Sequence, residues 1–268
     1  MNNQLTPVLF IPHGGGPLPL LGEANHRGMV TFLKEITTRI PNPKAVVVIS
    51  AHWEASVATV TSAGAPGLIY DYSGFPEDAY RIQYPAPGNP ALAEKIERIL
   101  GEAGLVAKFD VQRGFDHGVF VPMKLMFPDA DIPCVQVSLL KSLNPIEHIE
   151  LGKALNELRT QNVLILGSGF SFHNLRVMMS GTLNGKHPEN IAFEDWLDET
   201  CCDTSLESLD RENRLINWEQ APGARFCHPR EEHFLPLHVC AAAAGFSMAE
   251  RVFFEPILGA WTSGYLWQ

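Results

Sequence analysis

The sequence lacks several features that would assign it to common protein classes. Its 268 residues include only five cysteines, an odd number, and none of them has the CxxC spacing. A disulfide framework or a structural zinc knuckle is therefore not expected, and reduced thiols in a cytoplasm are the simplest interpretation. No window approaches the roughly 20 apolar residues that a membrane-spanning helix needs. The opening residues, MNNQLTPVLF, contain neither a basic region nor a long apolar run, so no secretory signal peptide is expected.

Basic patches, internal repeats and low-complexity segments are also missing. The formal net charge is −10, so a nucleic-acid partner is not expected. A hydrophobic content of 46% with 19% charged residues is typical of a globular protein with a sizeable core. The length suits one large α/β domain or at most two small ones. We expect one catalytic domain over residues 1–268.

Three apolar segments each lead into a histidine. Pro7 to Pro12 precedes His13, Ala45 to Ile49 precedes His52, and Val163 to Gly167 precedes His173. Short continuous apolar runs are typical of strands that a parallel sheet buries on both faces. Open α/β sheets bind ligands just beyond the carboxyl ends of their strands. We therefore predict that one edge of one sheet carries the active site.

The order of the remaining elements supports an α/β fold with helices on both faces of a central, mainly parallel sheet with mixed edges. Helices are expected over about 27–40, 90–102 and 145–159, and the last two open on Asn-Pro pairs that predict an N-cap and a first-turn proline. Further strands are expected at 57–61, 134–139 and 251–257, and the tail 260–268 could add an edge strand. Residues 174–226 are mostly polar and helical, with too few apolar residues for a core of their own. We expect them to be a helical excursion within the same domain.

The segment 63–90 is rich in glycine, proline, tyrosine and aspartate, and loops of this length inside a domain are usually functional. Its aromatic residues could wall a pocket for a planar ligand, or they could pack under the loop, and the sequence favours neither alternative. These residues are Tyr70, Tyr72, Phe75, Tyr80 and Tyr84.

Two further histidines stand in notable contexts. His117 lies between two glycines and follows Asp116, so it could swing into a site, although a surface turn is the alternative interpretation. His233 opens a helix. Taken with the three strand-end histidines, these residues predict a metal site, and imidazole ligands suit zinc or Fe(II) better than magnesium or calcium. No role is predicted for His26, His148 or His187, and His238 is expected on a different helix face from His233.

Seven motifs, in order along nearly the whole chain, together resemble a known family. They are PHGGGP around His13, SAHW around His52, IYDYSGFP from Ile69, YPAPG from Tyr84, GFDHG around His117, SGFSFHNL around His173, and EHFLPL around His233. The sequence resembles the class III extradiol ring-cleaving dioxygenases, in the branch similar to 4,5-DOPA dioxygenase.

The resemblance implies one non-haem Fe(II), for which zinc often substitutes in purified samples. It implies that His13, His52 and His233 are the metal ligands, and that the catalytic residues His173 and His117 lie beside them as acid/base and oxygen-handling groups. His173 could also serve as a fourth ligand. The wider superfamily uses two histidines and one glutamate, so the adjacent Glu231 and Glu232 leave the third ligand open.

The resemblance also implies the activity of an oxidoreductase that opens a catechol-type aromatic ring by extradiol cleavage with O2, giving a muconic semialdehyde-type product. Two alternatives use the same fold: a zinc-dependent hydrolase with a metal-bound water, and a non-enzymatic interaction protein. The sequence does not select the catechol, and a carboxylate on it could pair with Arg81, Arg176 or Arg230. A homo-oligomer is equally open.

Overall fold

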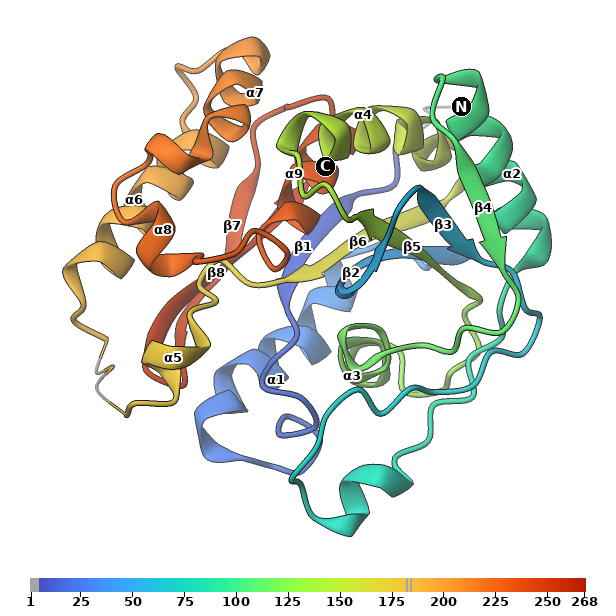
Figure 1. Cartoon of the computed structure of the whole chain (residues 1–268), viewed down its shortest axis with the longest axis horizontal. Coiled ribbons are helices and arrows are strands. Elements are labelled where there is room, and N and C mark those ends of the chain that lie inside the picture. The colour runs from blue at the N-terminus through green and yellow to red at the C-terminus, as the bar shows by residue number, and fades with distance from the viewer. Residues whose placement is uncertain (1–4, 182, 184) are drawn as a thin grey trace.

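An eight-stranded sheet runs through the middle of the molecule in the order β4-β3-β5-β2-β6-β1-β8-β7 (Figure 1). The computed structural model describes residues 5–181, 183 and 185–268. The four central strands β5, β2, β6 and β1 are parallel, whereas β3 pairs antiparallel with β5, and β8 pairs antiparallel with both β1 and β7. The strands are β1 (Val8–Pro12), β2 (Ala45–Ala55), β3 (Ala58–Thr61), β4 (Ala107–Asp110), β5 (Cys134–Leu140), β6 (Val163–Gly169), β7 (Glu250–Ile257) and β8 (Ala260–Trp267). The predicted α/β class with a mainly parallel, mixed-edge sheet is confirmed.

The central strands are apolar on both faces because helices cover both faces. Val8 and Phe10 of β1 pack into one core with α2, α4 and α9, whereas Leu9 and Ile11 pack into a second core with α1 and α3. In Figure 1, α4 and α9 lie on one side of the sheet and α1 and α3 on the other. These helices are α1 (Arg27–Glu35), α2 (Pro90–Glu102), α3 (His117–Met126), α4 (Pro145–Leu155) and α9 (Leu235–Ala243).

The two predicted Asn-Pro helix starts are confirmed. The side chain of Asn89 accepts a hydrogen bond from the Leu92 amide, and that of Asn144 accepts one from the Ile146 amide. Each cap satisfies a backbone donor that the first helical turn leaves without a partner. Short 3₁₀ turns extend or link the helices at Ala24–His26, Ile36–Arg39, Glu77–Arg81, Asn156–Gln161 and Trp218–Gln220.

The sheet edges differ from the sequence predictions. The tail forms a strand as expected, but β8 lies between β1 and β7, so β7 is the edge. At the opposite edge, β4 forms where no strand is predicted, because its partly or fully exposed residues AKFD contain no apolar run. The interpretation of His117 as part of a surface turn is wrong: this residue begins α3 and is only 6% exposed.

The excursion beyond β6 packs against the same core as the sheet. It contains α5 (Leu175–Met178), α6 (Pro188–Cys202), α7 (Ser208–Ile216) and α8 (Ala224–Cys227), and in Figure 1 these helices flank β7 and β8. Phe193, Leu197 and Trp218 are buried in the core cluster that also contains strand residues of β1 and β6. None of the helices in the described residues combines the length and the apolar character that crossing a lipid bilayer requires.

Helices α4 and α9 pack closely through small residues. A Cβ atom added to Gly152 in α4 would lie 2.3 Å from the Val239 carbonyl oxygen and 2.7 Å from the Ala242 Cβ, both in α9. The run of alanines in α9 and this one glycine therefore set the distance between the helix pair.

We expect Gly152→Ala to lower the free energy of unfolding by about 1–3 kcal/mol, because the added methyl group must push the two helices apart. Gly101→Ala is the matched control in α2, where an added Cβ meets nothing within 4 Å. That substitution should instead raise stability by about 0.5–1 kcal/mol, because alanine loses less conformational entropy in a helix. Urea unfolding of both variants tests the comparison, and equal effects would contradict it.

Candidate active site

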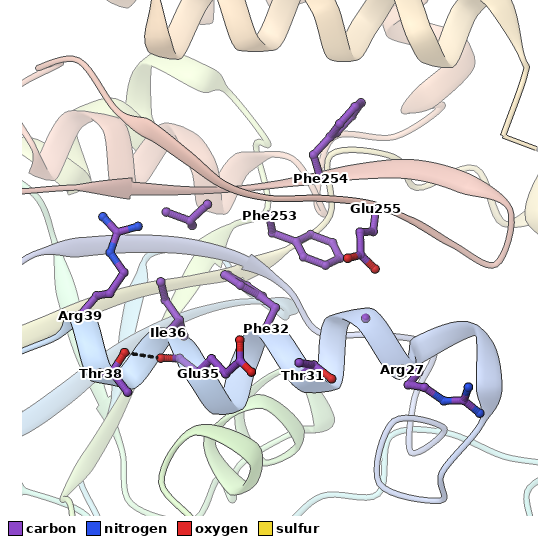
Figure 2. Close-up of a pocket in the computed structure, with 12 residues that line it drawn as sticks. Arg27, Thr31, Phe32, Glu35, Ile36, Thr38, Arg39, Phe253, Phe254 and Glu255 are labelled. Carbon is purple, nitrogen blue, oxygen red and sulfur yellow. Dashed lines mark hydrogen bonds between the residues drawn. The ribbon is translucent and has the colours of Figure 1, made fainter.

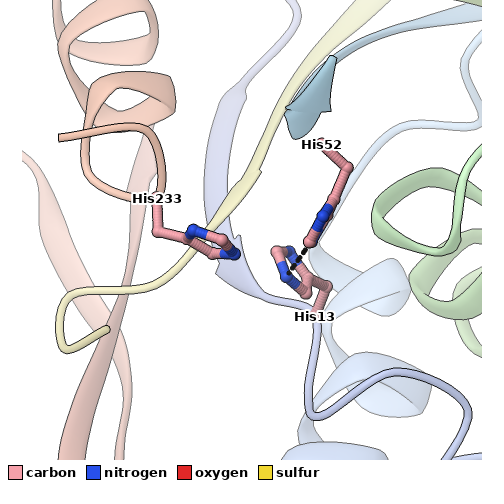
Figure 3. Close-up of side chains that lie close together, drawn as sticks. All are labelled: His13, His52 and His233. Atoms are coloured by element: carbon pink, nitrogen blue, oxygen red, sulfur yellow. Dashed lines mark hydrogen bonds between the residues drawn. The ribbon is translucent and has the colours of Figure 1, made fainter. Parts of the chain in front are cut away.

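Three histidines from distant parts of the chain meet at the carboxyl edge of the sheet. His13 directly follows β1, His52 lies in the last part of β2, and His233 precedes α9. One ring nitrogen of each lies within 4.8 Å of the others, and Figure 3 shows the three rings turned toward one another. His13 and His233 are almost fully buried. The structure thus brings together the three residues to which the resemblance assigns metal binding.

The position of His52 depends on an irregularity in β2. The pairing of β2 with β6 ends at Ser50, and its pairing with β5 shifts register between Ile49 and Glu54. The strand therefore continues past His52, but the ladder is interrupted around it. Such shifts redirect side chains near functional sites.

The glycine turn after His13 is held by a histidine for which no role was predicted. Gly14 and Gly16 have positive φ angles, and a Cβ on Gly14 would lie 2.4 Å from the Pro19 side chain, so this turn requires glycine. His26 Nε2 accepts the Gly15 amide at 3.0 Å, while its Nδ1 lies 2.6 Å from a Glu23 carboxylate oxygen. His26 therefore stabilises the turn through its hydrogen bond with the Gly15 amide and is not one of the clustered histidines.

The tautomer of His13 follows from its hydrogen bonds. Its Nδ1 lies 3.0 Å from the Ser168 hydroxyl oxygen, and that hydroxyl donates its only hydrogen to the Gly118 carbonyl. The hydroxyl oxygen must therefore accept the Nδ1 hydrogen of His13. This arrangement leaves a lone pair on His13 Nε2, the nitrogen that faces His52.

The spacing and protonation of the cluster fit a metal ion. The Nε2 atoms of His13 and His52 are 3.0 Å apart, and two nitrogens about 2.1 Å from one ion at a right angle would be separated by about 3.0 Å. Burial, reinforced by the neighbouring imidazoles, holds the pKa of His13 and of His233 well below the usual value, and burial lowers the pKa of His52 to about 4. Neutral imidazole is the form that binds a metal.

His173 lies flat against His233. The two ring centroids are 3.3 Å apart with an interplanar angle of 16°. One oxygen of Glu232 lies 2.9 Å from Nδ1 of His233 and 3.3 Å from Nδ1 of His173. Burial raises the pKa of Glu232, but the hydrogen bonds from the two imidazoles outweigh this effect and hold the pKa well below its usual value. Glu231 instead pairs with Arg225 at 2.6 Å, so Glu232 is the glutamate at the site, on the Nδ1 side of His233.

A buried polar network positions His117. The preceding Asp116 is fully buried and accepts hydrogen bonds from Ser50 Oγ at 2.7 Å, Gln136 Nε2 at 2.5 Å and Arg113 Nη2 at 3.0 Å. The ring of His117 lies 3.9 Å from that of His52 between centroids. A Cβ on Gly118 would lie 2.3 Å from Ser50 Oγ, which explains the glycine of the GFDHG motif. This network therefore joins the turn of His117 to the end of β2.

The aromatic residues of segment 63–90 divide between the two interpretations. The Tyr72 ring lies 5.9 Å from that of His117 between centroids, and Phe75 and Tyr80 pack against Tyr72. Burial raises the pKa of Tyr72 to about 12, so its phenol is neutral. Tyr84 is instead a core residue, 2% exposed, with its hydroxyl donating to the Phe127 carbonyl. Tyr72 is thus the tyrosine that stands beside the cluster.

Two of the three candidate arginines are already paired. Arg81 contacts Glu77 and Asp78, and Arg230 binds Glu54 through two hydrogen bonds and also contacts Glu232. Arg176 is exposed in α5, immediately after the His173 loop. Two other histidines serve the backbone: His148 Nε2 accepts the Leu140 amide, and His238 Nε2 lies 2.9 Å from the Leu215 carbonyl oxygen.

A surface cavity of about 680 Å³ lies away from the histidine cluster, between α1 and β7 (Figure 2). Phe32 and Phe253 form its apolar part, and Arg39 and Glu255 are among its charged residues. None of the clustered histidines lines it. The cluster, with five imidazoles and the neighbouring carboxylates of Glu232 and Asp71, is therefore the better candidate for catalysis.

The loop that carries His173 is anchored by a buried carboxyl group. Glu194 of α6 is fully buried, and its two oxygens lie 2.5 Å from the hydroxyls of Ser171 and Ser263. Burial raises the pKa of Glu194 to about 7. Glu194 thus connects the excursion to β8 and to the chain two residues before His173.

Comparisons with known proteins find a family model, relatives and a solved structure that match nearly the whole chain. Residues 7–261 match the family model of the catalytic LigB subunit of aromatic ring-opening dioxygenase. The chain is 39% identical to the dioxygenase tasH of Hapsidospora irregularis, over 98% of this chain and 86% of that protein. It is 36% identical to the 4,5-DOPA dioxygenase extradiol of Beta vulgaris, over 98% of this chain and 95% of that protein. The crystal structure of the uncharacterized protein JW3007 from Escherichia coli K12 superposes with a TM-score of 0.77 and 27% identity, over 98% of this chain and 100% of that one.

The raised pKa of Glu194 predicts a pH-dependent loss of stability. Between the unfolded value of about 4.5 and the folded value of about 7, the native state retains a proton that the unfolded state has released. Stability should therefore fall as pH rises through this window and level off above it, by on the order of 3 kcal/mol.

Glu194→Gln retains hydrogen-bonding partners for both serines and cannot ionise, so it should lack this component of the pH dependence. The measurement is the difference between wild type and variant in the free energy of unfolding from pH 4.5 to 8, which cancels the opposite contribution of the buried histidines. Glu199→Gln, on the exposed side of the same helix, is the matched control and should follow the wild type. A wild type and a Glu194→Gln variant with parallel pH profiles would contradict the assignment.

Proposed function

The chain belongs to the family of the catalytic LigB subunit of aromatic ring-opening dioxygenases, and from this premise we propose that it cleaves a catechol-type ring with O2 at a metal ion held by His13, His52 and His233. The product would be a muconic semialdehyde. One observation carries the proposal: three neutral imidazoles converge on one point, and two further imidazoles stand beside them. We assign the catalytic domain to residues 1–268, with 174–226 as an excursion whose apolar residues share the core of the sheet.

The three ligands fit a nitrogen-preferring divalent ion, and we propose Fe(II). A bound Fe(II) would acidify a catechol hydroxyl and supply the redox chemistry toward O2 that zinc lacks. Zinc at the same nitrogens could support only hydrolytic chemistry, which is the alternative that the metal test below separates.

His173 and His117 are the proposed acid/base residues. A Glu232 carboxylate oxygen lies 3.3 Å from Nδ1 of His173 and favours a hydrogen on that nitrogen, which leaves Nε2 of the ring to take a proton from the substrate. The ring of His117 lies next to the rings of His52 and Tyr72. We propose that Tyr72 provides an apolar wall for the substrate ring, since its hydroxyl is tied to the Ala79 carbonyl at 2.7 Å.

Two further parts of the proposal concern the cellular compartment and the recognition of a carboxylate on the substrate. The five cysteines form no disulfide, which fits a reducing compartment such as the cytoplasm. Arg81 and Arg230 are occupied by glutamate or aspartate partners, whereas Arg176 has no ion pair within the described part of the chain, so we propose Arg176 as the partner of a carboxylate on the catechol.

The direct test is oxygen uptake after anaerobic loading with Fe(II). A panel of catechols, with and without a carboxylate on the ring substituent, should give uptake with at least one member. The zinc-loaded protein should give none, and His13→Ala should lose both metal binding and uptake. Stoichiometrically bound iron with no uptake across the panel would refute the proposal, and ester hydrolysis by the zinc form would favour the hydrolase.

The second test separates ligands from acid/base residues. His173→Ala and His117→Ala should each reduce kcat by about 10²–10⁴-fold, because a positioned general base is lost. Fe(II) affinity should change by no more than a few-fold in either variant. His187→Ala is the control, since His187 stacks on Phe226 outside the cluster. A loss of iron binding in His173→Ala would instead make His173 a fourth ligand.

A further inference from the structure

Two carboxylates flank the histidine cluster, and each contacts two imidazoles of different proposed roles. Glu232 lies beside His233, a proposed ligand, and His173, a proposed acid/base residue. Asp71 lies on the other side, beside the proposed ligand His52 and the proposed acid/base residue His117. The arrangement is therefore paired: one carboxylate, one ligand and one acid/base imidazole on each side.

The two oxygens of Asp71 have different partners. Oδ1 accepts the backbone N–H of His117 at 2.9 Å and lies 2.9 Å from Nδ1 of the same residue, although the ring hydrogen is poorly aligned for a hydrogen bond. Oδ2 lies 3.5 Å from Nδ1 of His52. This distance is long for a hydrogen bond but short for an interaction between a charge and an N–H dipole.

The backbone around Asp71 is fixed by its own contacts. The Ile69 amide donates to the Phe115 carbonyl, and the Phe115 amide donates to the Gly67 carbonyl, both at 2.8 Å. These bonds pin the residues just before Asp71 to the residues just before His117. These hydrogen bonds therefore fix the position of Asp71 within the long segment 63–90.

We propose that Asp71 is a positioning residue for both imidazoles, holding His52 with its Nε2 toward the metal and His117 toward the substrate. The proposal rests on the proposed function, which makes His52 a ligand. An ionised carboxylate only accepts hydrogen bonds, so it favours the tautomer with hydrogen on Nδ1 and the lone pair on Nε2.

The role of Asp71 makes a prediction for metal binding that does not involve turnover. Asp71→Asn keeps an oxygen for the His117 amide but removes the charge, and its amide can donate toward His52. Titration of the metal-free protein with Co(II), followed by visible absorption, should show a dissociation constant raised by about 10–100-fold. Glu232→Gln should give a change of similar size through His233. Asp71→Glu, which keeps the charge, should recover part of the affinity.

Controls separate this effect from general disruption. Asp78→Asn lies in the same segment, where its exposed side chain pairs only with Arg81 among the described residues, and should bind Co(II) like the wild type. Thermal unfolding of the metal-free Asp71→Asn protein should match that of the metal-free wild type within a few degrees. If Asp71→Asn does not fold, Asp71→Glu and Asp71→Ser provide the same comparison with and without the charge.

A double-mutant cycle with His117→Ala distinguishes the two actions of Asp71. His117→Ala alone should leave Co(II) affinity within a few-fold of the wild type, and adding Asp71→Asn should lower it by the full 10–100-fold. For kcat with Fe(II) at saturating metal, Asp71→Asn should add little to the loss already caused by His117→Ala. Additive losses in kcat would overturn the assignment to His117.

The outcomes distinguish this inference from the function on which it rests. If His13→Ala and His52→Ala bind Co(II) like the wild type, the metal site itself is wrong. If those variants lose Co(II) while Asp71→Asn retains wild-type affinity, the metal site stands and the positioning role of Asp71 is overturned.

Discussion

The neutrality of His13, His52 and His233 within a crowded imidazole cluster is the constraint on which the rest of the site depends. Five histidine rings lie within contact distance of at least one other ring, in a region that burial shields from water. Positive charges at such distances repel strongly in a low dielectric, and burial further disfavours each charged form. His13, His52 and His233 are therefore neutral rings, each of which has one nitrogen with a hydrogen and one with a lone pair. The hydrogen-bond partners of each ring determine which of its nitrogens carries the hydrogen.

The fold fixes the orientation of the imidazole rings through the residues that lie next to them. Ser168, at the end of β6, accepts the Nδ1 hydrogen of His13, at the end of the neighbouring β1. The close approach of other elements then demands glycine at several points. A Cβ on Gly169 would lie 2.2 Å from the His233 carbonyl oxygen, to which the Phe170 amide also donates. The parallel strands thus do more than bring histidines near one another, because their neighbours also determine ring orientation.

Sequence patterns predicted much of this fold but only part of the site. The buried parallel strands, the capped helices and the histidines at strand ends are local features, and local features leave readable signals in apolar runs and Asn-Pro pairs. The partners of the rings leave no such signal. Ser168 is 155 residues from His13, and Asp71 lies in a segment that reads as an aromatic loop. No role is predicted from the sequence for His26 or His148, and only the tertiary contacts reveal that each of them accepts a backbone amide.

The two flanking carboxylates would also allow the three proposed neutral ligands to hold a divalent cation. Three imidazoles contribute no charge, so an ion held by them alone would bring two uncompensated positive charges into a largely buried site. Asp71 and Glu232 together supply two negative charges from the Nδ1 sides of His52 and His233. The carboxylates would thus compensate the charge of the ion through the imidazoles, without occupying its coordination positions. A site built in this way would leave those positions for the proposed aromatic diol and O2, and the same carboxylates would hold the proposed acid/base imidazoles beside them.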